Sequence, residues 1–574
     1  MNTKKKNDLI QFALLAAIII LVNVVGQYRF FRLDLTEDNR YTLSQATIAL
    51  LQKAEDPMLV EVYLEGDFPA GFQRLQRETR QLLDEFRAYN ADIEYEFINP
   101  NKAETKEDRE NLHKQLEQKG IRPFRLQARE EGGESVKTIF PGALLRYGNK
   151  EVAVPLVVSQ LGTEMNQQLN ASLQNLEYAL ANGVKQLVTT RRPLVAFLQG
   201  HDELSRMQMY DLARALSPHY DLSVFNIRRF EKDSLTGKIS LADQQRKLNR
   251  FDALVIAKPR KKFNKVDKYL IDQFAMSGGK VVWLIDAIHA SMDSLSKKPQ
   301  FMSYPIYQNL NINDMLFKYG VRINSNIVTD MIAARVADQE GSYPWVYFPQ
   351  VMPQVAHPIT KNINALKLQF PSSIDTVKAP GVKKTFLLRS SPYSRVVATP
   401  HLVTLGKLYN EPDPKLYQQK FVPMAVLLEG KFTSLFKNRI TPRKNGEPLS
   451  LVKQSNENKM VVIADGDVVR NQLNVVNPNI EKGAPLPLGY DQYTGITYGN
   501  RTFMLNLMDY LLDDTGLISV RSKEVRLRLL NRKLAANNKL QWQLVNTLVP
   551  VGLVLLFGAL LRFLRKRKYA QKIE

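Results

Sequence analysis

The chain has 574 residues, too many for a single hydrophobic core, so the length predicts three or four domains. Its 44% hydrophobic and 24% charged residues are typical of a mostly water-soluble chain and exclude a polytopic transporter. It has no cysteine, which excludes disulfides, thiolate nucleophiles and cysteine-ligated metal sites. The net charge of +22 favours an anionic partner, but no zinc finger, RNA-binding signature or basic-aromatic stripe is present, so no nucleic acid is expected.

The first apolar segment is Leu9–Gly26 (LIQFALLAAIIILVNVVG), which follows three lysines and is long enough to span a bilayer. A cleaved signal peptide is the alternative, because a basic n-region and an apolar core are both present. However, the apolar run is long, and no small-residue cleavage site follows it. We therefore predict an uncleaved transmembrane helix over residues 9–26, preceded by a cytoplasmic N-terminus over residues 1–8.

Residues 27–57 are expected to form a linker and a short helix, which Thr42 or Ser44 caps. Residues 58–190 alternate strand and helix patterns and predict a first outer domain. The expected strands are Met58–Leu64, Ile93–Ile98, Val136–Tyr147 and Val152–Val158, and the expected helices are a stretch around Leu75–Phe86, Glu104–Lys119 and Thr163–Val188. The β-α-β-α-β-β order is similar to a thioredoxin-like layout, and without thiols such a domain is predicted to be a scaffold.

Residues 191–515 predict a second outer domain, a parallel α/β sheet. Short apolar strands alternate with helical segments, one of which is Lys265–Met276 with Gly278-Gly279 as its stop. The expected strands are Leu194–Leu198, Leu222–Ile227, Ala253–Ala257, Lys280–Ile285 and Lys459–Asp465. A helix over Arg501–Leu512 is expected to complete the domain.

Ligands of parallel sheets lie at the carboxyl ends of the strands. His201, Asp202, Glu203 and Asp286, with Lys258, are expected at this edge and form the candidate ligand pocket. Their functional interpretation is acid-base chemistry or metal binding. The structural alternative is a turn at Gly200 with Asp202 or Glu203 as a helix cap, which the immediate succession of the three polar residues favours.

Residues 330–458 show a weaker pattern and are expected to form an irregular insertion, with strands at Thr385–Leu388 and Met424–Leu428. Prolines surround Trp345, Tyr347 and Phe348, which suggests an exposed segment whose aromatic rings contact a partner. A packed loop with buried rings is the alternative. Asp465-Gly466-Asp467 lacks the rest of a calcium-loop pattern and is interpreted as a strand-end turn.

The C-terminal part predicts contacts with a membrane. Residues 516–543 are expected to contain a basic amphipathic helix, in which Arg526, Arg528, Arg532 and Lys533 lie against lipid headgroups or a membrane partner. A solvated connecting helix is the alternative. Leu544–Leu561 carries no charge and spans roughly 27 Å as a helix, which predicts a second transmembrane helix. Gly552 and Gly558 within it are either close-contact points for a partner helix or lipid-facing positions.

The basic tail at residues 562–574 and the N-terminal lysines both favour the cytoplasm under the positive-inside rule. Both termini are therefore expected to be cytoplasmic, with about five hundred residues outside the membrane. The basic stretch before the second span opposes this orientation, but long domains translocate largely regardless of charge.

No ATP-binding loop is present, since each of the four Gly-Lys pairs is followed by an apolar residue and not by Ser or Thr. Neither a GxSxG nor an HExxH motif occurs. We therefore predict no cofactor and no catalytic residue, and energy for any transport would have to come from another protein.

Three segments, Arg32–Ser44, Gly66–Pro100 and Gly516–Leu534, resemble the GldG-type gliding-motility auxiliary proteins of ABC transporters in Bacteroidetes, and with the two spans the resemblance covers nearly the whole chain. It implies a second domain of flavodoxin-like or class I glutaminase-like fold, although the glutaminase cysteine is absent. It also implies partnership with an ABC permease and, through it, a cytoplasmic ATPase. A non-enzymatic periplasmic subunit of the bacterial inner membrane is the expected function. A glycan- or peptide-binding protein or an ecto-hydrolase using His201 is the alternative.

Overall fold

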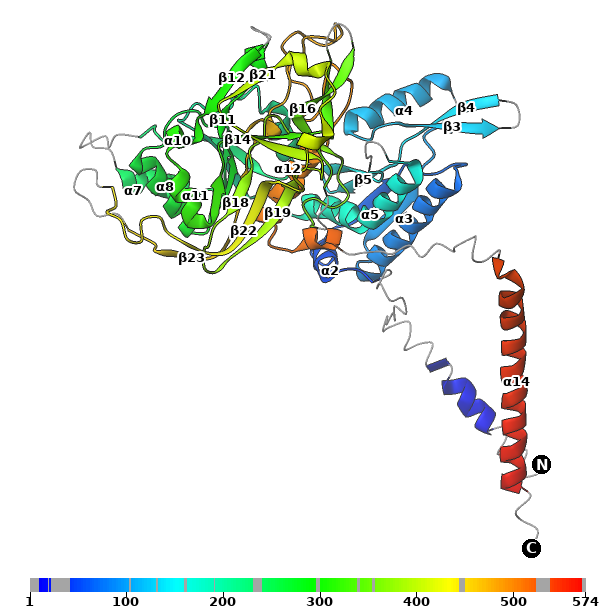
Figure 1. Cartoon of the computed structure of the whole chain (residues 1–574). Coiled ribbons are helices and arrows are strands. Elements are labelled where there is room, and N and C mark those ends of the chain that lie inside the picture. Colours follow the sequence, from blue (N-terminus) through cyan, green and yellow to red (C-terminus); the bar gives the residue numbers. More distant parts are fainter. Residues whose placement is uncertain are drawn as a thin grey trace. The chain divides into compact units, whose positions relative to one another are not determined.

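The computed structural model describes residues 10–18, 20–21, 42–102, 105–130, 133–158, 163–189, 191–230, 240–295, 300–337, 341–353, 357–442, 450–522 and 537–569. The chain divides into two compact units, and the larger contains Tyr41–Lys523 while the smaller contains Glu524–Glu574. We call residues 42–189 the N-terminal lobe and residues 191–522 the central lobe. Both lobes are of mixed α/β structure, as the sequence predicts (Figure 1).

The N-terminal lobe is built on a four-stranded sheet of order β2-β1-β5-β6, in which β1 and β2 are parallel and the other pairs antiparallel. Its elements are α2 (Gln45–Leu51), β1 (Met58–Val62), α3 (Ala70–Tyr89), β2 (Ile93–Phe97), α4 (Lys106–Lys119), β3 (Phe124–Glu130), β4 (Gly133–Ile139), β5 (Gly142–Tyr147), β6 (Lys150–Pro155) and α5 (Met165–Val188). Helices α3 and α5 pack together over one face, and Leu116 of α4 packs on the other, so the sheet is covered on both sides (Figure 1).

The predicted helices of this lobe are confirmed. Ser44 caps α2 by accepting a hydrogen bond from the Thr47 amide at 3.1 Å. The single strand predicted over Val136–Tyr147 is wrong, because the chain breaks at Phe140-Pro141 into β4 and β5. Strand β4 leaves the main sheet and pairs with β3, which the sequence analysis missed.

The central lobe is built on a seven-stranded sheet of order β19-β22-β23-β10-β9-β7-β8. The five strands from β23 to β8 are parallel, which confirms the predicted parallel α/β sheet. The parallel strands are β7 (Leu194–Gln199), β8 (Asp221–Asn226), β9 (Ala253–Ala257), β10 (Lys280–Leu284) and β23 (Gln454–Ile463), and the antiparallel edge consists of β19 (Val382–Arg389) and β22 (Pro423–Thr433). In chain order the parallel strands therefore lie 2-1-3-4-5.

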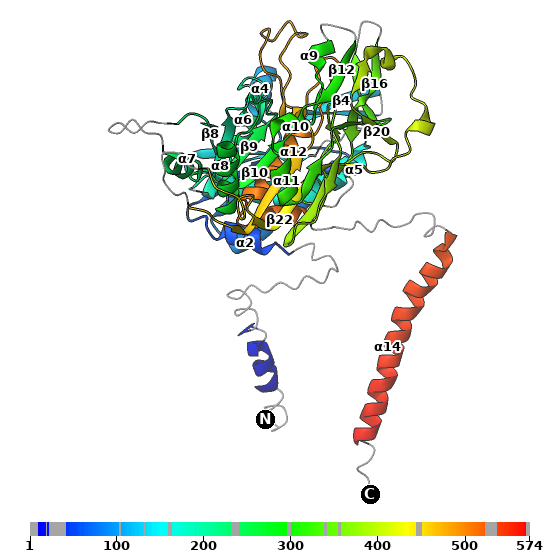
Figure 2. The same cartoon turned by 60° about the vertical axis from the view of Figure 1, so that its left-hand side comes forward.

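Helices cover both faces of this sheet because neighbouring residues of its strands point to opposite sides (Figure 2). One hydrophobic core joins Ala196 and Leu198 to helices α7, α8 and α11, and the other joins Val195 and Phe197 to α6 and α12. The helices are α6 (Tyr210–Leu216), α7 (Leu241–Leu248), α8 (Lys265–Met276), α11 (Asn313–Tyr319) and α12 (Asn500–Leu512). The predicted bounds of α8 are reproduced, with Ser277-Gly278-Gly279 following it.

The prediction that residues 330–458 are irregular is wrong, but the two strands expected there, Thr385–Leu388 and Met424–Leu428, are confirmed within β19 and β22. Most of this range forms antiparallel strands, which extend the main sheet through β19 and β22 or build small sheets beside it. The remaining short elements of the central lobe, some of which lie outside residues 330–458, are β11 (Ile288–His289), α9 (Met292–Leu295), β12 (Gln300–Pro305), α10 (Tyr307–Leu310), β13 (Val321–Ile323), β14 (Asn326–Asp330), β15 (Ala333–Ala337), β16 (Ser342–Val351), β17 (Leu366–Lys367), β18 (Ile374–Thr376), β20 (Ser394–Ala398) and β21 (His401–Thr404). Short 3-10 turns lie at Leu405–Leu408, Pro414–Leu416 and Asp467–Val469.

The aromatic segment expected to be exposed is the buried strand β16. Trp345 and Tyr347 are 0% exposed and Phe348 is 2% exposed, and all three rings pack against Phe370. Prolines fit this strand because the register shifts between Ala333 and Arg335 of its partner β15. The three aromatic residues therefore form core contacts, which confirms the alternative of buried rings and contradicts the alternative of an exposed partner contact.

The C-terminal helix α14 (Lys539–Tyr569) contains the predicted span Leu544–Leu561. Among the described residues, one helix is long and apolar enough to cross a membrane, Lys539–Arg567, and an 18-residue window within it has a mean hydropathy of 2.3. Of the predicted first span, residues 10–18 are helical and much of the rest lies outside the described residues, so that span stays a prediction.

Candidate functional site

His201 lies in the turn after β7, at the carboxyl edge of the central sheet, as predicted. Its ring is fully buried, stacks on Phe263 with 3.6 Å between centroids, and has a carboxylate at each nitrogen. Nδ1 lies 3.2 Å from Glu203 Oε1, and Nε2 lies 2.9 Å from Asp267 Oδ2. Burial opposes protonation, but the hydrogen bonds and charges of Asp267 and Glu203 outweigh it and raise the pKa of His201.

Glu203 holds the turn itself. Its Oε2 accepts hydrogen bonds from the amides of Gly200 at 3.0 Å and His201 at 2.8 Å. It does not cap the next helix, because α6 begins only at Tyr210. Asp202 is exposed and has a φ of 63°, a left-handed turn conformation. This geometry corresponds to the structural alternative, in which the polar triplet shapes a turn.

Asp267 joins this turn to helix α8. It lies in the first turn of α8, accepts hydrogen bonds from Arg228 Nε at 3.2 Å and Nη2 at 2.9 Å, and completes a capping box with Asn264. Burial alone would raise the pKa of Asp267, but the bonds from His201, Arg228 and the Asn264 amide lower it. His201 therefore links the end of β7 to the start of α8.

We expect His201→Ala to lower the free energy of unfolding by about 2–4 kcal/mol, because it opens a cavity beside Phe263 and removes one hydrogen-bonding partner from each of two buried carboxylates. Because the folded-state pKa of His201 is raised, its contribution is full below about pH 6.5 and is lost as the pH rises through the folded-state value. Urea unfolding of both proteins at several pH values checks this. A difference that grows with pH would contradict the assignment.

Asp286, the fourth predicted pocket residue, belongs to a different group. It follows β10, and its Oδ2 lies 2.9 Å from Lys258 Nζ, which also contacts Asp467 Oδ2. Lys258 follows β9, and Asp465 and Asp467 follow β23. Because β9, β10 and β23 are neighbours in the sheet, the polar residues at their carboxyl ends lie close together. The structure therefore does not bring the four predicted residues together. We call Lys258, Asp286, Asp465 and Asp467 the lysine-aspartate cluster.

The lysine-aspartate cluster is almost sealed from solvent. Lys258 is 3% exposed, and a Cβ atom at Gly466 would lie 2.6 Å from Lys258 Cβ, so only glycine fits there. Burial alone would lower the pKa of Lys258, but Asp286 and Asp467 raise it. Burial raises the pKa of Asp286, and raises that of Asp465 well above the usual range with the help of the neighbouring carboxylates.

The cluster resembles a metal site in one respect, since carboxylate oxygens of Asp286, Asp465 and Asp467 lie within 4.8 Å of one another. The ammonium of Lys258, however, already lies against two of these carboxylates. Asp286 Oδ1 accepts the Gly466 amide at 2.6 Å and Asp465 Oδ2 accepts the Gln369 amide at 2.7 Å. Among the described residues, Asp467 Oδ1 is buried without a hydrogen-bond partner and lies 3.6 Å from Arg470 Nη1. The cluster can therefore hold three strand ends together without a metal.

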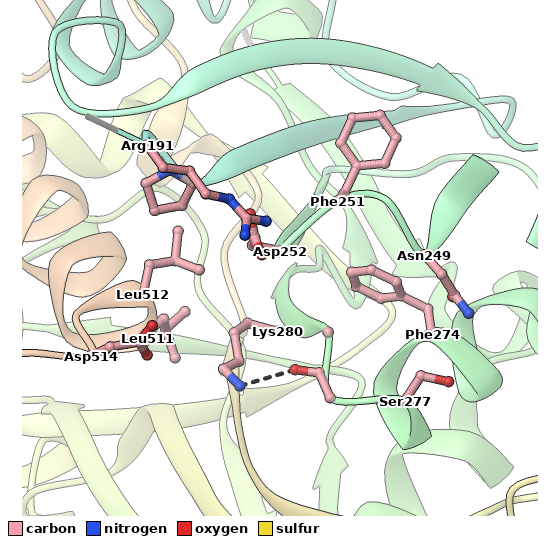
Figure 3. Close-up of a pocket in the computed structure, with 13 residues that line it drawn as sticks. Arg191, Asn249, Phe251, Asp252, Phe274, Ser277, Lys280, Leu511, Leu512 and Asp514 are labelled. Carbon is pink, nitrogen blue, oxygen red and sulfur yellow. Dashed lines mark hydrogen bonds between the residues drawn. The ribbon is translucent and has the colours of Figure 1, made fainter. Parts of the chain in front are cut away.

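A pocket of about 430 Å³ lies at the opposite, amino edge of the central sheet (Figure 3). Arg191 and Asp252 lie just before β7 and β9, Lys280 is the first residue of β10, and Asp514 follows α12. Phe251 and Leu512 are among the apolar residues of its wall. Arg191, Asp252 and Lys280 lie at or before the first residues of the strands, where ligand sites of parallel sheets are not expected, so the sequence did not predict this site.

The predicted membrane contacts are only partly placed. Arg526, Arg528, Arg532 and Lys533 lie outside the described residues. The beginning of the predicted basic helix differs from the expectation, since Leu517–Ser522 is a 3-10 helix, η4, and Arg521 within it is buried in the larger unit. On α14, a Cβ atom at Gly552 or Gly558 would meet no atom within 4 Å, so both positions are open.

Comparison with known proteins supplies the family. The family model described as "ABC-type uncharacterized transport system" matches residues 192–507, more than half of the chain, and a domain of unknown function matches residues 37–146. An uncharacterized protein of Borreliella burgdorferi is 23% identical over 576 residues, which cover 98% of this chain and 99% of the relative.

Two solved structures show weaker similarity. The mmIFT52 N-terminal domain is 14% identical, with a TM-score of 0.30, over 58% of this chain and 100% of its own. A ThuA-like protein from Parabacteroides merdae is 10% identical, with a TM-score of 0.25, over 59% of this chain and 94% of its own. Because these scores are low, the assignment rests on the family match: the chain belongs to the family of auxiliary proteins of ABC-type transport systems.

Proposed function

We propose that this protein is a non-enzymatic subunit of an ABC-type transporter complex, anchored in the bacterial inner membrane with both termini cytoplasmic and both lobes periplasmic. The observation that carries the proposal is the combination of the family match with α14, an apolar helix of spanning length. The expected partners are a membrane permease and, through it, a cytoplasmic ATPase, since the sequence has no ATP-binding loop of its own.

The buried charged groups support a structural role. His201 and Lys258 lie at the carboxyl edge of the sheet, where substrates of such folds bind, but both are sealed and bonded to carboxylates of the same chain. The strand order 2-1-3-4-5 supports a flavodoxin-like central lobe, and the order β2-β1-β5-β6 supports a thioredoxin-like N-terminal lobe. In the proposal both lobes serve as scaffolds that pass movement between the membrane and a periplasmic partner.

Purification of the tagged full chain in mild detergent, followed by identification of co-purifying proteins, tests the proposal. We expect a permease and an ATPase among the co-purifying proteins.

The two glycines of α14 allow a more specific test. Six residues turn a helix by roughly 600°, so Gly552 and Gly558 lie on different faces of α14. Gly552→Leu or Gly558→Leu, whichever lies on the docking face, is expected to reduce permease recovery about tenfold, through loss of about 1–2 kcal/mol of close packing.

Leu553→Ile is the matched control on the same helix and is expected to change nothing. Recovery of the chain with neither permease nor ATPase would overturn the proposal. The narrower assignment to gliding motility rests on the resemblance of Arg32–Ser44, Gly66–Pro100 and Gly516–Leu534 to GldG-type proteins. A preparation that contains the transporter subunits but no motility or secretion component would keep the broader proposal and remove this branch.

A further inference from the structure

The pocket at the amino edge of the central sheet has an unusual charge pattern. Two cations, Arg191 and Lys280, and two acids, Asp252 and Asp514, line one cavity. Within the part of the chain that the structure describes, none of the four forms an ion pair of 4.0 Å or less with any residue. Arg191 and Asp514 are exposed to solvent, where an ion pair contributes little, whereas Asp252 and Lys280 are partly buried.

The polar atoms of this pocket retain unused bonding capacity. The Lys280 ammonium has three hydrogens to donate, and among the described residues it donates one hydrogen bond, to the Gly278 carbonyl at 2.9 Å (Figure 3). Asp252 accepts the Leu194 amide at 2.7 Å through Oδ2 alone. Burial and the neighbouring charge of Lys459 lower the pKa of Lys280, and the charges of Asp514 and Asp252 oppose this only in part.

The wall between these charges is apolar. Phe251 and Leu512 are half-buried, and the ring of Phe274 lies beneath Gly279, where an added Cβ atom would come within 2.3 Å of it. A volume of about 430 Å³ is within the range of small-molecule sites. The cavity therefore offers donors for a carboxylate, acceptors for an ammonium and an apolar surface for a side chain.

We propose that this pocket binds a free α-amino acid with an apolar side chain. Arg191 and Lys280 receive the carboxylate, Asp252 and Asp514 receive the ammonium, and Phe251 and Leu512 contact the side chain. The pocket also touches the segment that leads toward the membrane helix, because the neighbouring Asp513 binds Lys185 of α5 at 2.9 Å and accepts the Ile518 amide at 3.1 Å. A ligand bound in the pocket would thus stabilise the segment that connects α12 of the central lobe to η4.

Calorimetry and thermal unfolding of the full chain in detergent test the proposal with L-phenylalanine and L-leucine as probes. We expect binding of at least one amino acid. Phenethylamine, which lacks the carboxylate, and 3-phenylpropionate, which lacks the ammonium, are each expected to bind at least about tenfold more weakly than phenylalanine. Lys280→Gln and Asp514→Asn are expected to weaken amino-acid binding by a similar factor.

Lys318→Gln and Asp92→Asn, at exposed positions that do not line the pocket, are the matched controls. Thermal unfolding without ligand shows whether each variant is folded, and Asp514→Asn changes an exposed residue and should not disturb the fold. The proposal is overturned if neither amino acid binds at about 10 mM, a weak-binding limit. It is also overturned if an analogue lacking one charge binds equally well, or if the pocket and control variants behave alike.

Discussion

Lys258→Met is expected to lower the free energy of unfolding by about 3–5 kcal/mol, because it leaves the buried carboxylates of the lysine-aspartate cluster without their cation. Lys258 is 3% exposed and contacts both Asp286 and Asp467. Chemical unfolding of the full chain in detergent measures the effect. Lys261→Met is the control, since Lys261 is an exposed lysine three residues away, and its expected effect is below about 0.5 kcal/mol.

The pH dependence of this variant is a second readout. Asp286 and Asp465 already have raised pKa values in the folded protein, and removing the ammonium raises them further. An acid with a raised folded-state pKa costs stability as the pH rises through that value, so the deficit of Lys258→Met should be larger at about pH 8 than at about pH 5. Adding Asp286→Asn, which keeps an acceptor for the Gly466 amide, should recover part of the loss. A pH-independent deficit that Asp286→Asn does not reduce would contradict the ionic assignment.

Asp509→Ala is expected to lower the free energy of unfolding by about 3–5 kcal/mol and to weaken the junction between the two lobes. Asp509 of α12 accepts hydrogen bonds from Tyr178 of α5 at 2.8 Å and from Tyr220 at 2.6 Å. The guanidinium of Arg521 lies 5.1 Å from the centre of the Tyr178 ring. Burial lowers the pKa of Arg521, and the charge of Asp509 opposes that effect, so the acid stabilises the buried cation.

Because of where the tryptophans lie, the unfolding of the two lobes can be followed separately in this experiment. Trp283 and Trp345 lie in the central lobe, the third tryptophan is Trp542 of α14, and the N-terminal lobe has none. In the native chain, fluorescence and circular dichroism should report one unfolding transition. In Asp509→Ala the unfolding curves measured by fluorescence and by circular dichroism are expected to separate. The reason is that the N-terminal lobe contributes to circular dichroism but not to tryptophan fluorescence. Asp375→Ala, which removes an exposed ion pair with Arg322, is the control and should cost at most about 1 kcal/mol.

Arg521 also explains why the start of the membrane-proximal segment was misinterpreted. In sequence it begins a run rich in leucine and arginine, which predicts a basic amphipathic helix. In the structure its Nε and Nη2 donate to the carbonyls of Pro358 at 3.0 Å and Lys361 at 2.6 Å, while Leu517, Ile518 and Val520 enter the core of the N-terminal lobe. These partners lie far away in sequence, so local periodicity could not reveal them.

The parallel sheet was predictable because its strands are buried on both faces and read as short, continuous apolar runs between helices. Ala253–Ala257 and Lys280–Leu284 are examples, and their bounds agree with the prediction to within one residue. Strand β16 has the same kind of apolar run, but its prolines, which fit at a register shift, concealed it. Whether a proline interrupts a strand or lies at an irregularity depends on the partner strand, which local sequence does not contain.

The sequence by itself determined the alternation of strands and helices, the apolar span near the C-terminus and the absence of an ATP-binding loop, because these depend on residue order over short distances. It also placed His201, Lys258 and Asp286 correctly at the ends of their strands. Only the tertiary structure decided how these residues pair, since the strand order places Lys258 beside Asp286 and Asp467, whereas His201 meets Asp267 on α8. Burial then decided their role, because charged groups that lie out of water and satisfy one another hold a fold together.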